Sequence, residues 1–153
     1  MDESDVRAHV LGLPTRTREG DREVLVERYT SGTEPFYRPI GGGVEFGEWS
    51  EDAVVREFRE ETGYAVTPER FLGVSENVYE FAGTPGHEVS LVWAVAFERE
   101  GPYDRERIRV EEGSGGERWA TWHTPEALRT GPEPCYPVGV FDLFGDQART
   151  TSD

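Results

Sequence analysis

The sequence contains no lysine: all 16 basic side chains among its 153 residues are arginines, and 31 residues are acidic. The formal net charge is -15 at pH 7, so the chain lacks the basic surface that attracts nucleic acid or anionic lipid. We therefore expect neither a nucleic acid nor a membrane as a partner. At 1 M salt the Debye length is only about 3 Å, which makes such self-repulsion tolerable. The composition thus predicts a halophilic protein.

Cysteine and long apolar runs are scarce as well. Cys135 is the only cysteine, which excludes an internal disulfide framework and a cysteine-based zinc site, and we interpret it as a small apolar residue. No run of 18 apolar residues occurs, so we expect no transmembrane helix. The acidic start MDESDVRAHV lacks the apolar segment of a signal peptide, which predicts a cytoplasmic protein.

What the chain does contain is a series of segments with strand and helix patterns. Alternating apolar residues predict strands over 5–14, 23–30, 36–40, 71–81, 88–97 and 118–123. Turns are predicted over 15–22 and 82–87, and an irregular segment over 98–117. Helices are predicted over 50–62, 125–128 and 136–144. This order indicates one mixed α/β domain over 1–153, with its core at about 5–145 and a frayed tail at 146–153.

The helix over 50–62 carries the most informative pattern. Ser50 is placed to cap its start, and Gly63 is placed to end it in the left-handed conformation. Because a helix turns by about 100° per residue, Glu57, Glu60 and Glu61 share one stripe beside the apolar stripe. Three carboxylates at the edge of a core are costly unless a cation neutralises them, and hard divalent cations such as Mg²⁺ prefer oxygen ligands.

Glycines precede this helix. Gly41, Gly42, Gly43 and Gly47 let the backbone bend tightly and come close to a ligand, and their loop also carries Glu45 and Glu48. From Gly42 to Tyr64 the chain resembles the Nudix box of the MutT-like hydrolases, G-x5-E-x7-R-E-U-x-E-E-x-G-U, where U is apolar. Each specified position matches when the tyrosine is counted as apolar.

The resemblance implies an α/β/α sandwich with a mixed sheet that hydrolyses a nucleoside diphosphate linked to another moiety. It implies that Mg²⁺, with Mn²⁺ as a substitute, is held by Glu57, Glu60 and Glu61 and by a backbone carbonyl at Gly42, and that Glu57 and Glu60 serve in catalysis. The implied phosphate-binding residues are Gly41 and Gly42, and the implied supporting residues of the box are Glu48, Arg56 and Gly63. A homodimer is left open.

The general base is not settled by the box. Glu112 lies in a glycine-rich stretch before a tryptophan, as in MutT-like members, and Glu88 opens the strand after the hairpin. Glu111 is a register alternative, and Glu60 or Glu61 could also serve. Glu112 could equally be a solvated loop acid, and for Glu88 that interpretation is the more favoured one.

Substrate choice is less defined. Arg38 could bind a phosphate and the neighbouring Phe36 and Tyr37 could stack on a base, although ordinary strand packing explains them as well. A small nucleotide such as ADP-ribose, a nucleotide sugar or a (d)NTP is the expected substrate. The alternatives are a catalytically silent nucleotide-binding module, an isopentenyl diphosphate isomerase, which needs a cysteine in its first half, and an RNA-decapping relative, which the charge disfavours.

The charge balance generates a first prediction. We expect the free energy of unfolding to be larger in about 2 M KCl than in about 50 mM KCl, because salt screens repulsion among the 31 acidic side chains. Urea denaturation followed by tryptophan fluorescence at both salt concentrations measures this difference. Equal stability in both would exclude halophilic adaptation.

Overall fold

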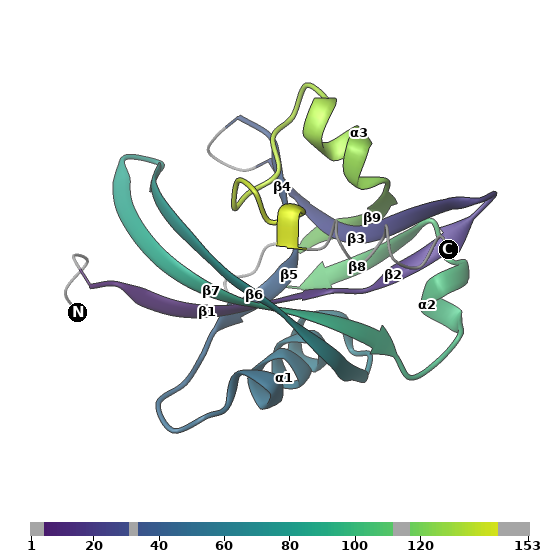
Figure 1. The fold of residues 1–153 in the computed structure, drawn as a ribbon, viewed down its shortest axis with the longest axis horizontal. Helices are drawn as coiled ribbons and strands as arrows, with labels where there is room; N and C mark the ends of the chain where they lie inside the picture. The colour runs from purple at the N-terminus through teal and green to yellow at the C-terminus, as the bar shows by residue number, and fades with distance from the viewer. Residues whose placement is uncertain (1–4, 31–33, 112–116, 144–153) are drawn as a thin grey trace.

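Two β-sheets form the centre of the fold (Figure 1). The computed structural model describes residues 5–30, 34–111 and 117–143. The first sheet has the strand order β5-β1-β7-β6, in which β1 and β7 are parallel and the other pairs are antiparallel. Its strands are β1 (Arg7–Leu13), β5 (Ile40–Gly43), β6 (Val66–Phe81) and β7 (Thr84–Phe97).

The second sheet is antiparallel throughout, with the order β2-β3-β9-β8 and with β4 paired to β3. Its strands are β2 (Thr15–Arg18), β3 (Asp21–Tyr29), β4 (Phe36–Arg38), β8 (Arg107–Glu111) and β9 (Glu117–His123). The predicted strand over 36–40 is therefore divided: its first part pairs in this sheet as β4 and its end begins β5 in the other.

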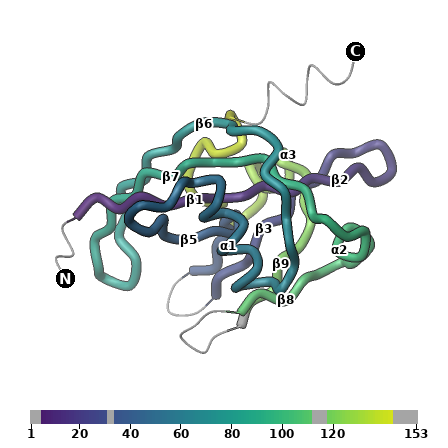
Figure 2. Tube along the Cα trace, turned by 90° about the horizontal axis from the view of Figure 1, so that it is seen from below, coloured from purple at the N-terminus to yellow at the C-terminus, as the bar shows by residue number. Residues whose placement is uncertain are grey.

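The helices lie on opposite sides of the sheets. They are α1 (Ser50–Thr62), α2 (Gly101–Asp104) and α3 (Pro125–Thr130). In Figure 1, α1 lies below the sheets and α3 above them, and in Figure 2, seen from below, α1 lies beside β1 and β5. This arrangement confirms the predicted α/β/α fold with a mixed sheet. Among the described residues, no helix has the length and apolar character that crossing a membrane requires.

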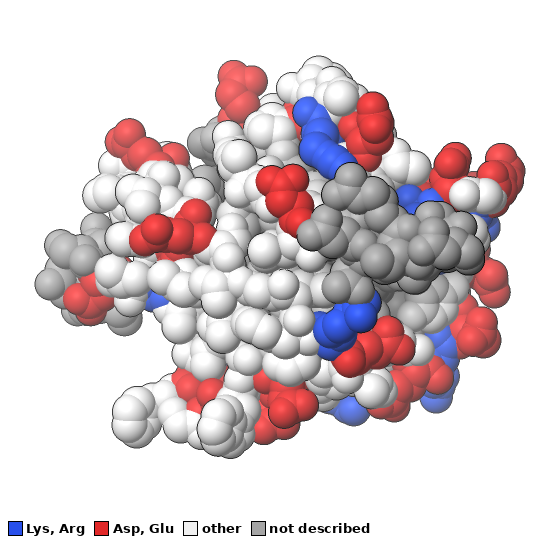
Figure 3. Space-filling model, in the orientation of Figure 1, with Lys and Arg blue, Asp and Glu red and all other residues white. Residues whose placement is uncertain are grey.

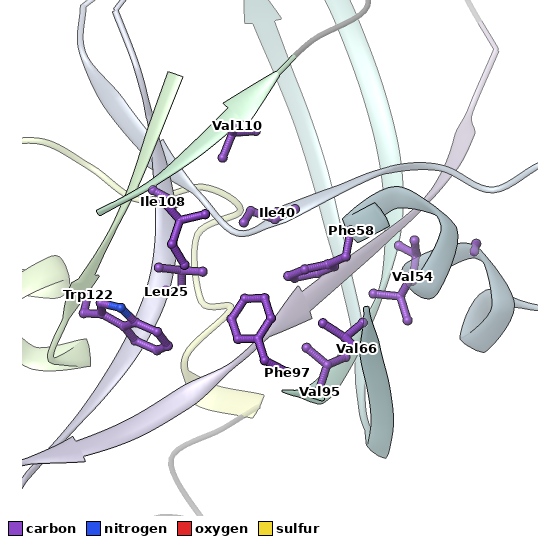
Figure 4. Close-up of a cluster of buried hydrophobic side chains, with 13 residues drawn as sticks. Leu25, Ile40, Val54, Phe58, Val66, Val95, Phe97, Ile108, Val110 and Trp122 are labelled. Atoms are coloured by element: carbon purple, nitrogen blue, oxygen red, sulfur yellow. The ribbon is translucent and has the colours of Figure 1, made fainter. Parts of the chain in front are cut away.

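The core has two parts because alternate residues of a strand face opposite sides. Along β1, Val10 faces the cluster under α1, whereas Leu11 and Leu13 face the cluster under α3. In the first cluster the rings of Phe58 and Phe97 meet edge to face, with centroids 6.0 Å apart (Figure 4). The apolar stripe of α1 is thus anchored to both sheets.

Of the two predicted ends of α1, only the C-terminal end is confirmed. Gly63 takes a φ of 79°, and its N–H donates to the carbonyl of Arg59, as the left-handed cap requires. Ser50 is not the N-cap: Trp49 occupies that position without a side-chain cap. The Ser50 hydroxyl instead accepts a hydrogen bond of 3.0 Å from Nε1 of Trp93 on β7, a tertiary contact that local pattern does not contain.

Two predicted turns are shorter than expected, because polar residues on both sides continue the strands. The stretch 15–22 forms the β2–β3 hairpin around Glu19 and Gly20, with φ values of 54° and 87°. The stretch 82–87 forms the β6–β7 hairpin around Ala82 and Gly83, with φ values of 52° and 85°. Two-residue loops with positive φ at both positions match the twist of paired strands.

The segment predicted to be irregular, 98–117, contains α2 and β8, so that prediction was wrong. In β8, Ile108 and Val110 are buried and alternate with exposed charged residues. This period-two pattern is present in the sequence, but its three charged positions hid it. The strand completes the second sheet by pairing with β9.

The prediction of a helix over 136–144 was also wrong. The described part of that segment consists of turns, and only Asp142 and Leu143 are helical. Gly139 has a φ of 85°, which a right-handed helix excludes. Val140 and Phe141, which suggested a helix, are buried against the second core cluster instead. The short helix predicted over 125–128 is present and continues to Thr130.

A close approach between β1 and α1 generates a second prediction. A Cβ at Gly12 would lie 2.5 Å from Cε1 of Phe58 and 2.9 Å from Cγ2 of Val54. We expect Gly12→Ala to lower the free energy of unfolding by about 1–3 kcal/mol, the usual cost of overpacking a core. Urea denaturation measures it, with Gly101→Ala as the control, because nothing lies within 4 Å of a Cβ there. Equal midpoints for Gly12→Ala and wild type would show that α1 is not in tight contact with β1.

Candidate active site

Two of the glycines before α1, Gly41 and Gly42, lie where a side chain would collide with its neighbours. They belong to β5, which pairs with β1 so that Gly42 is opposite Val10 and Gly41 is opposite Leu11. A Cβ at Gly41 would collide with the carbonyl oxygen of Val10. A Cβ at Gly42 would lie 2.5 Å from Oε1 of Glu57. The backbone of β5 therefore lies directly against a carboxylate of α1, the close approach that the glycines predicted.

The predicted stripe of carboxylates borders the core. Glu57 and Glu61 are buried, with 8% and 9% of their surface exposed, whereas the side chain of Glu60 is 59% exposed. Phe58 lies between them in the sequence and is fully buried in the first core cluster. Because a buried carboxylate needs a compensating partner, the position of these glutamates marks a site rather than a solvated face.

Arg56 supplies the nearest positive charge. Its Nε and Nη2 donate to both oxygens of Glu48, at 2.8 and 2.9 Å, and Nη2 also donates to the carbonyl of Gly43 at 2.9 Å. Its Nη1 donates to Glu57 at 2.9 Å and to Glu60 at 3.4 Å. The predicted pairing of Arg56 with Glu48 is present, and the same guanidinium joins the glycine strand to α1.

This pairing perturbs the titration of Glu48. Hydrogen bonds from Arg56 and from the backbone N–H of Glu45 lower the pKa of Glu48 to about 2. Glu48 therefore stays ionised throughout the neutral range and holds Arg56 in place. Through this guanidinium it is linked to Glu57 and Glu60.

The residues around Arg56 suit a hard divalent cation. Their donors are carboxylate oxygens and backbone carbonyls, the ligands that Mg²⁺ prefers, and Gly42 leaves the face of Glu57 open to the strand. Over residues 5–30, 34–111 and 117–143, no three His, Cys, Asp or Glu side chains are gathered as a metal-binding group. Glu57 and Glu60 instead turn toward Arg56 in this conformation.

A second buried cluster surrounds Glu88 on β7. The Tyr79 hydroxyl donates to one oxygen of Glu88 at 2.5 Å, and Arg38 donates to the other at 3.3 Å. The same Nη2 of Arg38 lies 2.8 Å from Nδ1 of His9. Because a guanidinium can only donate, Nδ1 of His9 is the acceptor. Burial lowers the pKa of His9 and raises the pKa of Tyr79 to about 12, so both are neutral at pH 7.

The structure therefore brings Arg38 and Glu88 together, although sequence reasoning treated them separately. Sequence reasoning also missed three partners. Glu27 is 1% exposed and accepts hydrogen bonds from Arg118 at 3.0 Å and from Tyr29 at 3.3 Å. A lone glutamate after the apolar run Val24–Val26 was the available signal. His9 and Tyr79 had no comparable signal, because their contacts join strands far apart in the chain.

Two candidates for the general base remain, Glu111 and Glu112, and the structure describes only the first. Glu111 lies at the exposed end of β8, where its carboxylate is 3.4 Å from Nη2 of Arg109. Its ion pair is with Arg109 and not with Arg56. Glu112 lies outside the described residues.

A cavity of about 670 Å³ opens beside the Glu88 cluster. It lies among strands β3, β4 and β6 and the segment 134–138. Phe36, predicted to offer a ring, lines it, whereas Tyr37 lines a smaller cavity with His123 and Arg28. Cys135 is half-buried beside the second core cluster, which raises the pKa of its thiol to about 12 and agrees with its interpretation as an apolar residue.

Comparisons with known proteins identify the family and the fold. A family model described as "NUDIX domain" matches residues 6–138. A NUDIX hydrolase from Nitrosomonas europaea is 20% identical with a TM-score of 0.65, over 95% of this chain and 90% of that one. A MutT NUDIX hydrolase from Burkholderia pseudomallei is 25% identical with a TM-score of 0.59, over 92% and 98%. The NUDIX domain of Shewanella oneidensis NrtR, solved with ADP ribose, is 15% identical with a TM-score of 0.62, over 98% and 90%.

The lowered pKa of Glu48 generates a third prediction. A carboxylate with a depressed pKa contributes its full stability above its ordinary value near 4.5 and loses it as the pH falls toward about 2. We therefore expect Glu48→Gln to be less stable than wild type at pH 6, and the difference to shrink toward zero between pH about 4.5 and 2.

Urea midpoints measured at intervals of pH test this expectation. The control is Glu106→Gln at an exposed glutamate, for which the difference from wild type should stay small at every pH. A Glu48→Gln difference that does not change with pH would contradict the assigned ion pair.

Proposed function

The chain belongs to the NUDIX domain family of hydrolases, and from that premise we propose that it cleaves the diphosphate linkage of a small nucleoside diphosphate derivative with the help of Mg²⁺. The observation that carries the proposal is the environment of Arg56. One guanidinium holds Glu48, Glu57 and Glu60 beside a strand in which Gly41 and Gly42 leave no room for a side chain. Nudix hydrolases generally use divalent metals of this kind.

We assign the cation to Glu57, Glu60 and Glu61 and to the backbone carbonyl of Gly42. A bound Mg²⁺ neutralises a diphosphate and polarises its phosphoryl oxygens. Arg56 positions Glu57 and Glu60 by hydrogen bonds to both, and Glu48 positions Arg56. We assign the phosphate contact to the backbone of Gly41 and Gly42, because Gly42 lies directly against the carboxylate of Glu57, one of the assigned cation ligands.

For the general base, the geometry disfavours Glu88. Its two oxygens already accept from Tyr79 and Arg38, and its cluster belongs to the cavity rather than to the surroundings of Arg56. Glu60 has the most exposed carboxylate of the α1 stripe and is free to reach solvent water. We therefore keep Glu60 and Glu112 as candidates to orient the attacking water or accept its proton.

A nucleotide-binding module without catalysis is the second function to consider. The NUDIX domain of NrtR was solved with ADP ribose bound, so a related fold accommodates that ligand. In this chain the box keeps each of its glutamates, together with the arginine that holds them. That completeness favours catalysis.

The fourth prediction tests the hydrolase. We expect phosphate release, revealed by a coupled phosphatase, from at least one member of a panel containing ADP-ribose, nucleotide sugars, dinucleoside polyphosphates and (d)NTPs. Release should require Mg²⁺ and stop with EDTA. Glu60→Gln should lower kcat/KM at least about 100-fold, because loss of a ligand or base removes stabilisation of the transition state.

The matched control is Glu51→Gln, a change of the same kind at an exposed position in the first turn of the same helix. It should keep wild-type activity. Calorimetric binding of the panel members to wild type and Glu60→Gln separates the two functions. Tight binding of a panel member without turnover, at both high and low KCl, would contradict the hydrolase and support a nucleotide-binding module.

A further inference from the structure

Helix α1 covers only part of the sheet face that lies on its side of the molecule. Along β1, Val10 is buried in the cluster under α1, whereas Ala8, two residues earlier on the same face, is exposed. Strand register places Leu91 of β7 beside Val10, and Val74 of β6 beside Leu91. In Figure 2, seen from the α1 side, the β6–β7 hairpin and the start of β1 extend beyond α1.

Two valines of β6 lie exposed on this uncovered part of the sheet. Val74 is 52% exposed and Val78 is 72% exposed. Because alternate residues of a strand face opposite sides, Val78 shares the face of Val74. Tyr79 points to the other face, where its hydroxyl donates to Glu88. The exposed valines therefore belong to the α1 side and not to the Glu88 cluster.

The loop between β5 and α1 adds two aromatic rings on the same side. Phe46 is fully exposed and Trp49 is 78% exposed. The loop is tied to the sheet at both ends: the N–H of Val44 donates to the carbonyl of Ala8 at 3.0 Å, and the serine after Trp49 accepts from Trp93 of β7. Uncharged side chains project from the lower left of the face shown in Figure 3, where Figure 1 places this loop.

Phe71 connects the loop to the hairpin. Its ring meets the ring of Trp93 edge to face, with centroids 5.4 Å apart, and it is 44% exposed. Further along β6 come the two exposed valines. We use the name hairpin face for the five exposed apolar residues on this side, Phe46, Trp49, Phe71, Val74 and Val78.

The size of the hairpin face fits a second copy of the chain. An aromatic side chain can bury about 150–250 Å², so Phe46 and Trp49 alone offer on the order of 400 Å². With the other three residues the face approaches the roughly 800 Å² that each partner contributes to a standard interface. The largest apolar patch on a typical monomer covers only about 300–600 Å². Homodimer interfaces are also the most apolar class, and a two-fold axis lets one patch cover its own copy.

The charge on the hairpin face agrees with the same partner. Between Val74 and Val78 lies Glu76, whose carboxylate is 2.8 Å from Nε2 of His87 on the neighbouring strand. Because this carboxylate already has a partner, the face does not require a basic protein to complete it. Each copy carries a net charge of -15, so two copies repel one another in dilute salt and approach freely once salt screens that repulsion.

The edge of β6 is less suited to pairing than its face. An unpaired edge strand can add a strand from another chain, and β6 is the last strand of its sheet. Its pairing with β7 is shifted between Pro68 and Arg70 and again between Phe71 and Gly73. Such irregularities bend a strand and blunt its edge, and a proline has no N–H to donate. The apolar side chains stand roughly perpendicular to the sheet, so a partner covers them from the face.

From these observations we propose that two copies of this chain associate through their hairpin faces into a two-fold symmetric homodimer, and that concentrated salt strengthens this association. The inference goes beyond the proposed function and does not depend on it. A chain that hydrolyses nothing in the assay above would still form this dimer.

The fifth prediction concerns the mass of the full chain in solution, measured by sedimentation equilibrium from about 1 to 200 µM. In about 2 M KCl we expect a species of twice 17.3 kDa with a micromolar Kd, within the range found for interfaces of this size. In about 50 mM KCl the Kd should be at least about tenfold weaker, because repulsion between the two acidic chains is then poorly screened.

Two variants locate the interface. Phe46→Ser removes a fully exposed ring, and Val74→Glu places a carboxylate in the covered face of each copy. Each should weaken the Kd at least about 30-fold, the effect of losing a central contact residue. Because both side chains are exposed in the single chain, urea midpoints at about 1 µM protein should stay close to wild type.

The matched control is Val138→Glu. Val138 is 75% exposed, but it belongs to the segment that lines the cavity of about 670 Å³ and not to the hairpin face. The variant adds the same charge to each copy as Val74→Glu and should keep the wild-type Kd.

Three results would overturn the inference. A mass of 17.3 kDa at about 200 µM in both salt concentrations would assign the hairpin face to a different partner. A dimer that Phe46→Ser and Val74→Glu both leave intact would place the contact between copies elsewhere. A dimer that weakens as KCl rises would be held by ion pairs instead of by apolar surface.

Discussion

The guanidinium of Arg56 is the interaction on which the candidate site depends. It is bound to both oxygens of Glu48, to Glu57, to Glu60 and to the carbonyl of Gly43. Those partners come from the loop before α1, from α1 itself and from β5, so a single side chain sets the distance between helix and strand. A lysine could not replace it, because an ammonium group lacks the planar fork that meets a carboxylate with two parallel hydrogen bonds.

Packing contacts also hold α1 in position against β1 and β5. Gly12 lets Phe58 lie against β1, and Gly42 lets the carboxylate of Glu57 lie against β5. The first contact removes apolar surface from water, and the second keeps a charged group at the boundary of that apolar core. Because the two glycines lie on neighbouring strands of one sheet, the helix can be neither rotated nor shifted without a collision.

Local pattern was sufficient to predict the part of the molecule that local interactions determine. The helix over 50–62, its end at Gly63 and the carboxylate stripe all follow from spacing within one segment. The same reasoning failed for β8, whose three charged positions hid its alternation, and for 136–144, where the positive φ of Gly139 and burial of Val140 prevailed. It could not place His9 beside Arg38 and Glu88, because that contact requires β1, β4 and β7 to be assembled. The catalytic and metal-binding roles of the glutamates stay predictions.

Two arginines thus each hold a buried glutamate, Arg56 holding Glu57 and Arg38 holding Glu88. Around Arg56, the glutamates that face the guanidinium are the ones that a divalent cation would use, so this cluster suits the anionic end of a nucleotide. Around Arg38, Nη2 of the guanidinium contacts Glu88 and His9, and this cluster lies beside the aromatic lining of the cavity. His9 joins the two, since it pairs with Gly43 on one side and contacts Glu88 on the other. On the proposed function, an acidic chain binds an anionic substrate in this way, because a divalent cation held by its carboxylates neutralises the diphosphate.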